Sequence, residues 1–151
     1  MLVHELLTAT ACAIEPETTL QQAAILMGKR DVGALAVLKG NYVVGIVTDR
    51  DLAVRGLAAG LSPEAPVSLV MTRGVHACHA DEHVADVLLD MELLQVCRVP
   101  VENGNDEFVG MLSLRDLAAV CTDEEVGRTY KHIHHRRHHE VPVLQQAPQA
   151  A

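Results

Sequence analysis

Two segments of the chain carry an apolar stripe at the spacing of one helical face. The stripe positions are Leu20, Ala23, Ala24 and Met27 in one segment and Val84, Val87, Leu88 and Met91 in the other. Two short apolar runs follow each stripe, at 34–38 and 43–47 and again at 98–101 and 108–112. Such runs, joined by a turn, predict a hairpin. With short strands at 12–14 and 76–78, the pattern predicts strand, helix, strand, strand and helix, twice.

The two segments belong to an internal repeat. Sliding the chain by 64 positions aligns 3–37 with 67–101 without a gap, and six pairs, among them Val3/Val67 and Met27/Met91, are identical. One extra residue enters the second copy at the hairpin turn, where insertions cost least, and 45–52 then aligns with 110–117. We therefore predict an α+β fold with repeat 1 at 2–60, a linker at 61–66, repeat 2 at 67–121 and a tail at 122–151. Because the linker is short, the repeats should pack as one body.

Residues that cap helices stand at the predicted helix starts. Thr18 to Gln21 fits a capping box, and Asp81 is placed to cap the helix of the second repeat. Thr122 with Glu125 predicts a further helix in the tail. Residues after Val143 are predicted to be unstructured.

The composition is that of a folded chain with an aliphatic core. Hydrophobic residues make up 49% and charged residues 21%, with no Trp, one Phe and two Tyr. The formal net charge is −8, and nine His add a charge that changes steeply with pH. An acidic chain with few aromatics lacks the basic face and the stacking surfaces of a nucleic-acid binder.

The chain also shows no sign of export or membrane insertion. No apolar stretch reaches the length of a membrane span, and the start of the chain does not read as a signal peptide. The four Cys residues form no dense framework, so we expect reduced thiols and a cytoplasmic protein. The sequence contains no G-x-G-x-x-G, P-loop or G-x-S-x-G motif, and we predict that it is not an enzyme.

Candidate chemistry lies where the last strand of each repeat meets its last helix. Thr48 and Ser113 each place a hydroxyl at a helix start, where free backbone amides favour an anion such as phosphate. Asp51 and Asp116 follow three residues later, and an ionised carboxylate can accept hydrogen bonds from both hydroxyls of a ribose. The neighbouring Arg50 and Arg115 could pair with phosphate. The bland alternative is that both pairs are helix caps and nothing more.

The complete repeat resembles a tandem pair of CBS domains (cystathionine-β-synthase-type domains), known as a Bateman module. The resemblance covers about 2–121 and is carried by the segments 45–51 and 110–116 and by Arg98-Val-Pro-Val101. The stretch 56–63 is similar to the linker of small stand-alone bacterial CBS-pair proteins, such as the hypoxic response protein group.

This resemblance implies a regulatory ligand-binding module. CBS pairs pack with pseudo-two-fold symmetry around a cleft with two potential sites for AMP, ADP, ATP or a related adenosyl ligand. It also implies a homodimer and a downstream protein that the sequence does not identify, without a catalytic cofactor. The acidic composition and the lack of a long apolar stretch, described above, predict no nucleic-acid partner and no membrane partner. The residues implied to hold ribose and phosphate are Thr48, Arg50 and Asp51 in one site and Ser113, Arg115 and Asp116 in the other. The strand starts at 32–35 and 96–99 would flank the base, together with Ala13, Ile14, Ala77, Cys78, Val99 and Pro100.

The first repeat departs from the family pattern in two places. It has Ala36 where the second has Pro100, and Asp49 adds a negative charge where the second has Leu114. If only one site is occupied, we expect it to be the one around Ser113 and Asp116.

The histidines support a second hypothesis, a metal- or pH-responsive binding protein. His76, His79 and His83 cluster in sequence, and His134 and His138 have i,i+4 spacing on a predicted helix, although Arg136 and Arg137 oppose a cation. Ordinary strand, loop and solvated-helix roles are the favoured interpretation of these residues. A third hypothesis is a structural dimer whose motifs only cap helices.

Overall fold

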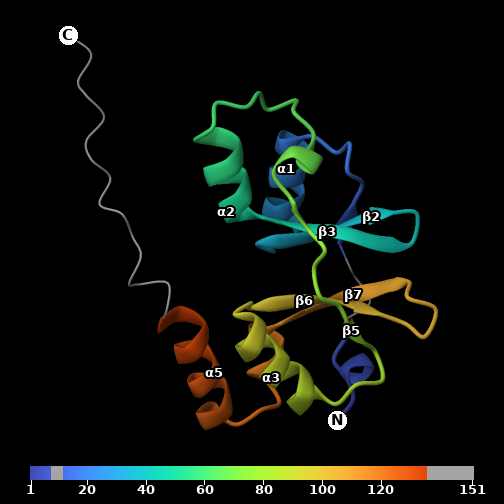
Figure 1. The fold of residues 1–151 in the computed structure, drawn as a ribbon, viewed down its shortest axis with the longest axis vertical. Helices are drawn as coiled ribbons and strands as arrows, with labels where there is room; N and C mark the ends of the chain where they lie inside the picture. The colour runs from blue at the N-terminus through green and yellow to red at the C-terminus, as the bar shows by residue number, and fades with distance from the viewer. Residues whose placement is uncertain (8–11, 136–151) are drawn as a thin grey trace.

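The computed structural model describes residues 1–7 and 12–135 (Figure 1). The predictions for His138 and for the end of the tail therefore lie outside the described residues. In repeat 1 the elements are η1 (Val3–Glu5), β1 (Ala13–Ile14), α1 (Leu20–Arg30), β2 (Ala34–Lys39), β3 (Tyr42–Thr48), α2 (Asp49–Asp51) and the π-helical η2 (Leu52–Leu57).

Repeat 2 has the same succession of 3-10 helix, strand, helix, hairpin and helix, with one more short strand and one more helix among its described elements. Its elements are η3 (Val67–Leu69), β4 (Thr72–Arg73), β5 (Cys78–His79), α3 (Val84–Leu94), β6 (Arg98–Glu102), β7 (Phe108–Ser113), α4 (Leu114–Leu117) and the C-terminal α5 (Asp123–His135). The predicted succession of strand, helix, strand, strand and helix is confirmed in both copies, as is the α+β class. Among the described residues, no helix is long and apolar enough to cross a membrane.

Two small sheets form the middle of the molecule, with the helices on their outer sides (Figure 1). The first has the order β1-β2-β3-β4 and the second β5-β6-β7. In each, the short first strand runs parallel to the next strand, and the hairpin is antiparallel. Both hairpins shift register at the same place, between Val37 and Leu38 and between Val101 and Glu102. The turn of one hairpin meets the other where Asn41 O accepts from Phe108 N at 2.8 Å.

The first segment of each repeat packs into the core of the other repeat. Val3 is fully buried in the core of repeat 2, and its amide donates to Glu82 O at 3.0 Å. Val67 and Val70 are fully buried in the core of repeat 1, and Val67 N donates to Thr18 O at 2.8 Å. The two repeats are thus joined through their cores as well as by the linker.

Two helix starts differ in detail from the sequence prediction. α1 is capped one residue later than expected, by Thr19 with Gln22 in a reciprocal capping box. The prediction that Asp81 caps α3 is wrong: the N-cap is His83, which makes no side-chain cap bond. The amide of Val84, the first residue of α3, donates to Met1 O at 3.1 Å, so the N-terminal segment satisfies one of the amides at the helix start that have no partner within the helix.

Candidate functional site

Both strand-to-helix corners form the same local structure. Asp51 Oδ2 accepts hydrogen bonds from Thr48 N at 2.9 Å and Thr48 Oγ1 at 2.8 Å, and Thr48 Oγ1 accepts from Asp51 N at 3.1 Å. In repeat 2, Asp116 Oδ2 accepts from Ser113 N at 2.8 Å and Ser113 Oγ at 2.6 Å. Each hydroxyl and carboxylate pair is therefore a helix cap, and at both corners all these bonds use only one oxygen of the carboxylate.

A backbone hydrogen bond ties each corner to the start of the preceding hairpin. Asp49 N donates to Gly33 O at 3.1 Å, and Leu114 N donates to Cys97 O at 2.8 Å. These bonds extend the pairing of β2 with β3 and of β6 with β7 by one residue. As a result, each capped aspartate lies beside the strand start of its own repeat.

The surroundings of the two aspartates differ. Asp51 is half-buried, with its side chain 16% exposed, and its Oδ1 lies 3.7 Å from Arg55 Nε. Asp116 is exposed, and among the described residues no Lys, Arg or His pairs with it. The outer carboxylate oxygen is thus engaged by the protein in repeat 1 and available to a ligand in repeat 2.

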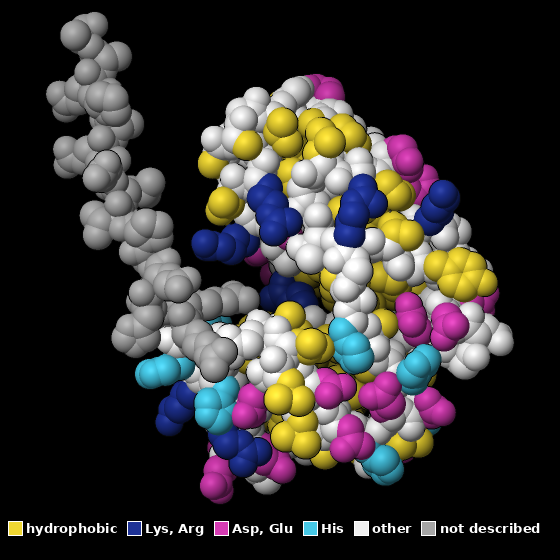
Figure 2. All heavy atoms as spheres, in the orientation of Figure 1, with side chains coloured by type: hydrophobic (Ala, Val, Ile, Leu, Met, Phe, Trp, Pro, Cys, Tyr) yellow, Lys and Arg dark blue, Asp and Glu magenta, His cyan; other side chains and the backbone are white. Residues whose placement is uncertain are grey.

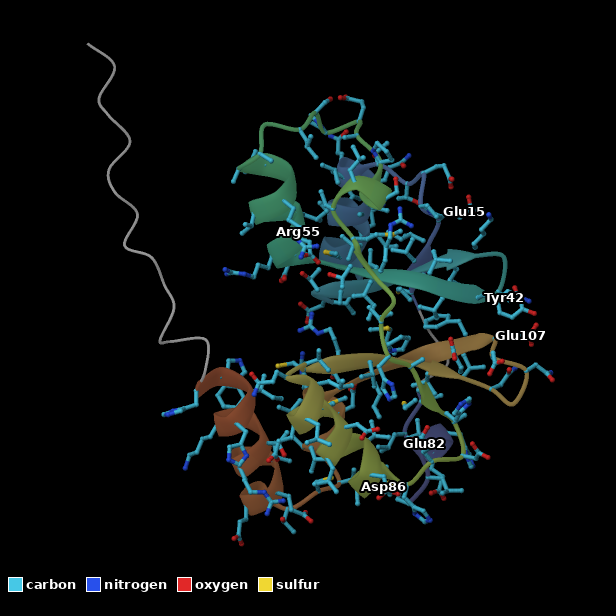
Figure 3. The ribbon with its side chains drawn as sticks, viewed as in Figure 1. Glu15, Tyr42, Arg55, Glu82, Asp86 and Glu107 are labelled. Atoms are coloured by element: carbon cyan, nitrogen blue, oxygen red, sulfur yellow. The ribbon has the colours of Figure 1, made fainter. Side chains whose placement is uncertain are left out.

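A cavity of about 690 Å³ lies between the repeats beside Asp116, which is large enough for a small-molecule ligand. It is lined by the strand starts of both repeats, the second corner and α5: Cys12, Asp31, Val32, Gly33, Ala34, Cys97, Arg98, Met111, Ser113, Leu114, Arg115, Asp116, Ala118, Val126, Tyr130 and His134. In Figure 2 Lys and Arg side chains gather on the upper half of this face and reach the boundary between the halves, whereas most of the Asp, Glu and His side chains lie on the lower half.

The cavity combines charged, polar and apolar groups. Arg98 and Arg115 supply positive charge, Ser113 a hydroxyl and Asp116 a carboxylate acceptor. Gly33 allows Arg98 to approach, because a Cβ at that position would lie 3.2 Å from Arg98 Nη1 and 2.9 Å from Asp49 Oδ2. This arrangement suits a ligand that carries phosphate, hydroxyl groups and an apolar portion.

The structure brings some of the predicted residues to the cavity and leaves others away from it. Ser113, Arg115 and Asp116 line it, as do 32–34 and 97–98 from the predicted strand starts. The predicted residues that do not line it are Thr48, Arg50, Asp51, Ala13, Ile14, Ala77, Cys78, Val99 and Pro100.

Several of these residues have structural roles instead. Cys78 and Val99 are buried in the core of repeat 2. Burial, with the nearby charge of Glu82, raises the pKa of the Cys78 thiol to about 12. The backbone amide of Arg50 donates to the neighbouring Asp49 carboxylate at 2.8 Å.

The cavity also contains residues that the sequence analysis did not assign to a nucleotide site. The most prominent are Tyr130 and His134 of α5, whose rings stack with centroids 4.1 Å apart and planes 24° from parallel. With Val126 they form an i, i+4, i+8 stripe, which was visible in the sequence as helical spacing. That spacing did not reveal that this face of the helix borders the second corner.

The histidines do not gather into a metal site in the part of the chain that the structure describes. His76 Nε2 lies 3.5 Å from Asp90 Oδ2, and His83 is the N-cap of α3. Among the described residues, no three His, Cys, Asp or Glu side chains are arranged to hold a metal ion.

Two similar α+β repeats, each completed by a segment of the other and separated by a cavity at a capped corner, define a tandem-repeat module. The family model of the CBS domain matches residues 3–56 and 67–123, and the chain belongs to the CBS domain family.

Relatives of similar length occur in bacteria. The CBS domain-containing protein YhcV of Bacillus subtilis is 32% identical over 138 residues, which is 91% of this chain and 98% of YhcV. Hypoxic response protein 1 of Mycobacterium tuberculosis is 32% identical over 132 residues, covering 86% of this chain and 92% of the relative.

Solved structures of CBS pairs share the fold. Hypoxic response protein I, solved with two coordinated zinc ions, superposes with a TM-score of 0.72 at 30% identity, covering 81% of this chain and all of that one (100%). The CBS pair of protein MJ0100, in complex with 5′-methylthioadenosine and S-adenosylmethionine, gives a TM-score of 0.72 at 26% identity, with 80% of this chain and 98% of that chain covered.

Proposed function

We propose that this protein senses adenine nucleotides, AMP, ADP or ATP, or a related adenosyl ligand, which it binds in the cavity beside Ser113 and Asp116. The observation that carries the proposal is the exposed carboxylate of Asp116, which no described Lys, Arg or His pairs with, in a cavity that two arginines also line. The adenosyl ligands of the related MJ0100 pair support the same ligand class.

The chemistry of the cavity fits the parts of a nucleotide. The outer oxygen of Asp116 accepts hydrogen bonds from the ribose hydroxyls while the inner oxygen keeps the helix cap. Arg98 and Arg115 pair with the phosphate, and apolar side chains such as Val32 and Met111 contact the base. The proposed role is that of a regulator and not of a catalyst.

The position of the cavity suggests how binding becomes a signal. Its lining comes from Asp31–Ala34 of repeat 1 as well as from repeat 2, so a ligand there favours one relative arrangement of the repeats. A partner protein, or the second subunit of a homodimer, reads that arrangement. By linkage, the partner must in turn change the affinity for the nucleotide.

Titration calorimetry with AMP, ADP, ATP and S-adenosylmethionine tests the proposal. We expect saturable binding of at least one of them by the wild type and a loss of affinity of about 30-fold in Asp116→Asn, because hydrogen bonds to a charged acceptor contribute about 1.5–3 kcal/mol. Asp51→Asn is the matched control and should bind like the wild type. Equal losses in both variants would assign the site elsewhere, and no binding by the wild type would leave the corners as helix caps alone.

A further inference from the structure

The C-terminal helix α5 is held on α3 by a polar cluster around Glu92. Thr129 Oγ1 donates to Glu92 Oε2 at 3.1 Å, and His132 Nδ1 lies 2.5 Å from Glu92 Oε1. Gln95 Nε2 donates to His132 O at 3.1 Å, and Thr129 and Ile133 are fully buried. Figure 1 shows α5 beside α3 at the edge of the molecule. This face of α5 is therefore anchored to repeat 2.

A second face of the same helix borders the cavity. Val126, Tyr130 and His134 line it, and His134 Nδ1 lies 2.9 Å from Tyr130 O while its ring stacks on the Tyr130 ring. The Tyr130 side chain thus has a fixed neighbour, although the residue is 54% exposed. The chain has only one Phe, two Tyr and no Trp, and Tyr130 is the one of these three aromatic residues in the cavity lining.

These residues lie beyond the part of the chain that the family model matches. That match ends at residue 123, where α5 begins. The wall made by α5 is consequently an addition to the two repeats, and it lines the same cavity as Arg98 and Asp116.

We propose that Tyr130 and His134 contact the bound nucleotide, so that nucleotide binding and the docking of α5 on α3 stabilise each other. The inference rests on the proposed function and extends it to a part of the chain outside the CBS repeats. A ligand that contacts α5 only in its docked position must favour that position, and a change that weakens docking lowers the affinity by the factor by which it lowers the docked fraction. α5 then reports occupancy of the cavity at the molecular surface.

The affinity for AMP tests the contact. We expect Tyr130→Ala to weaken binding about tenfold, on the scale of a lost aromatic contact to a nucleotide, and Tyr130→Phe to stay within about twofold of the wild type. Lys131→Ala, on the exposed face of the same helix, is the matched control. Glu92→Gln does not alter the cavity lining but weakens docking, and it should lower affinity about threefold. Wild-type affinity in both Tyr130→Ala and Glu92→Gln would overturn the inference.

Amide hydrogen exchange with and without AMP tests the coupling. In the wild type we expect AMP to slow exchange in two segments, 113–116 and the amides of α5. In Tyr130→Ala, saturating AMP should still slow exchange at 113–116 but not in α5. Protection at 113–116 alone in the wild type would contradict the coupling and leave the proposed function intact, whereas an absence of AMP binding by the wild type would reject the proposed function and this inference together.

Discussion

The corners of repeat 1 and repeat 2 have the same backbone and the same cap but opposite exposure of the carboxylate. At the first corner Arg55 lies beside the outer oxygen of Asp51, and at the second corner no basic residue of the described chain pairs with Asp116. The cavity lies at the second corner, and only there does α5 add a wall. The shared capping motif therefore fixes the position of the carboxylate, and the neighbouring side chains determine whether its outer oxygen is engaged by the protein or left accessible to a ligand.

The largest expected difference is in the rate of thiol alkylation, which should be much higher for a cysteine in the cavity than for one in the core. With a pKa of about 12, Cys78 is ionised to about one part in ten thousand at pH 8, and it is 1% exposed. Cys97 is only partly buried and lines the cavity. We expect iodoacetamide to alkylate Cys97 and leave Cys78 unmodified in the folded protein, as measured by mass spectrometry of peptides.

AMP provides the control for this comparison. Saturating AMP should slow the alkylation of Cys97, and urea should expose Cys78 to the reagent. Rapid alkylation of Cys78 in the native protein would contradict its placement in the core of repeat 2.

The next comparison concerns Gly33, whose counterpart in the second repeat is Cys97. Replacing Gly33 with a residue that carries a Cβ makes the two repeats more alike at this position. Gly33→Ala places a Cβ 2.9 Å from Asp49 Oδ2 and 3.2 Å from Arg98 Nη1, so at least one of these side chains must move. We expect a loss of AMP affinity of about fivefold, because the charge-assisted contact from Arg98 is weakened.

A second glycine serves as the control. Gly28 lies in α1, and a Cβ there would meet no atom within 4 Å. Gly28→Ala should leave AMP binding unchanged and stabilise the protein by about 0.5–1 kcal/mol in urea denaturation. If Gly33→Ala binds AMP as the wild type does, either the Asp49 side chain alone moves aside or Arg98 is not a phosphate ligand, and Arg98→Ala separates the two outcomes.

Stability should respond alike to the loss of either cap. Asp51→Asn and Asp116→Asn each remove a charged acceptor from a capping box, and we expect each to lower the free energy of unfolding by about 1 kcal/mol. Urea denaturation monitored by circular dichroism measures the difference. A cost confined to one variant would show that the two caps are not equivalent in the fold.

The smallest effect is expected from Arg55→Ala. Its guanidinium lies 3.7 Å from Asp51 and donates to Val70 O at 3.2 Å, but the side chain is 53% exposed. Such an ion pair stabilises a protein by no more than about 1 kcal/mol, so the midpoint in urea should shift only slightly. AMP affinity at the second corner should not change, and a change there would mean that the corners are coupled.

The fold could be predicted from the sequence because its signals are local and occur twice. The apolar stripes of α1 and α3 and the two hairpins are given by spacing, and the repeat confirms each element by its copy. The start of α3 could not be predicted in the same way, since Met1, 83 residues away in sequence, supplies the acceptor for Val84.

The candidate site could be predicted only in part for the same reason. Ser113, Arg115 and Asp116 belong to a contiguous motif and line the cavity. Tyr130 and His134 reach it only because Glu92 and Gln95 anchor α5 on α3, and no local pattern states which face of a helix meets which neighbour. Cys78, predicted near the base, belongs to the core because β5 turns its side chain inward.

The exchange of first segments between the repeats makes the molecule a single cooperative unit. Val3 completes the core of repeat 2, while Val67 and Val70 complete that of repeat 1. A chain divided within the linker would leave each half with apolar residues uncovered and without part of its core, so neither half can serve as an autonomous folding unit. Heating should therefore melt both repeats in one transition. The chain contains two copies of one repeat, and each copy depends on the first segment of the other to complete its core.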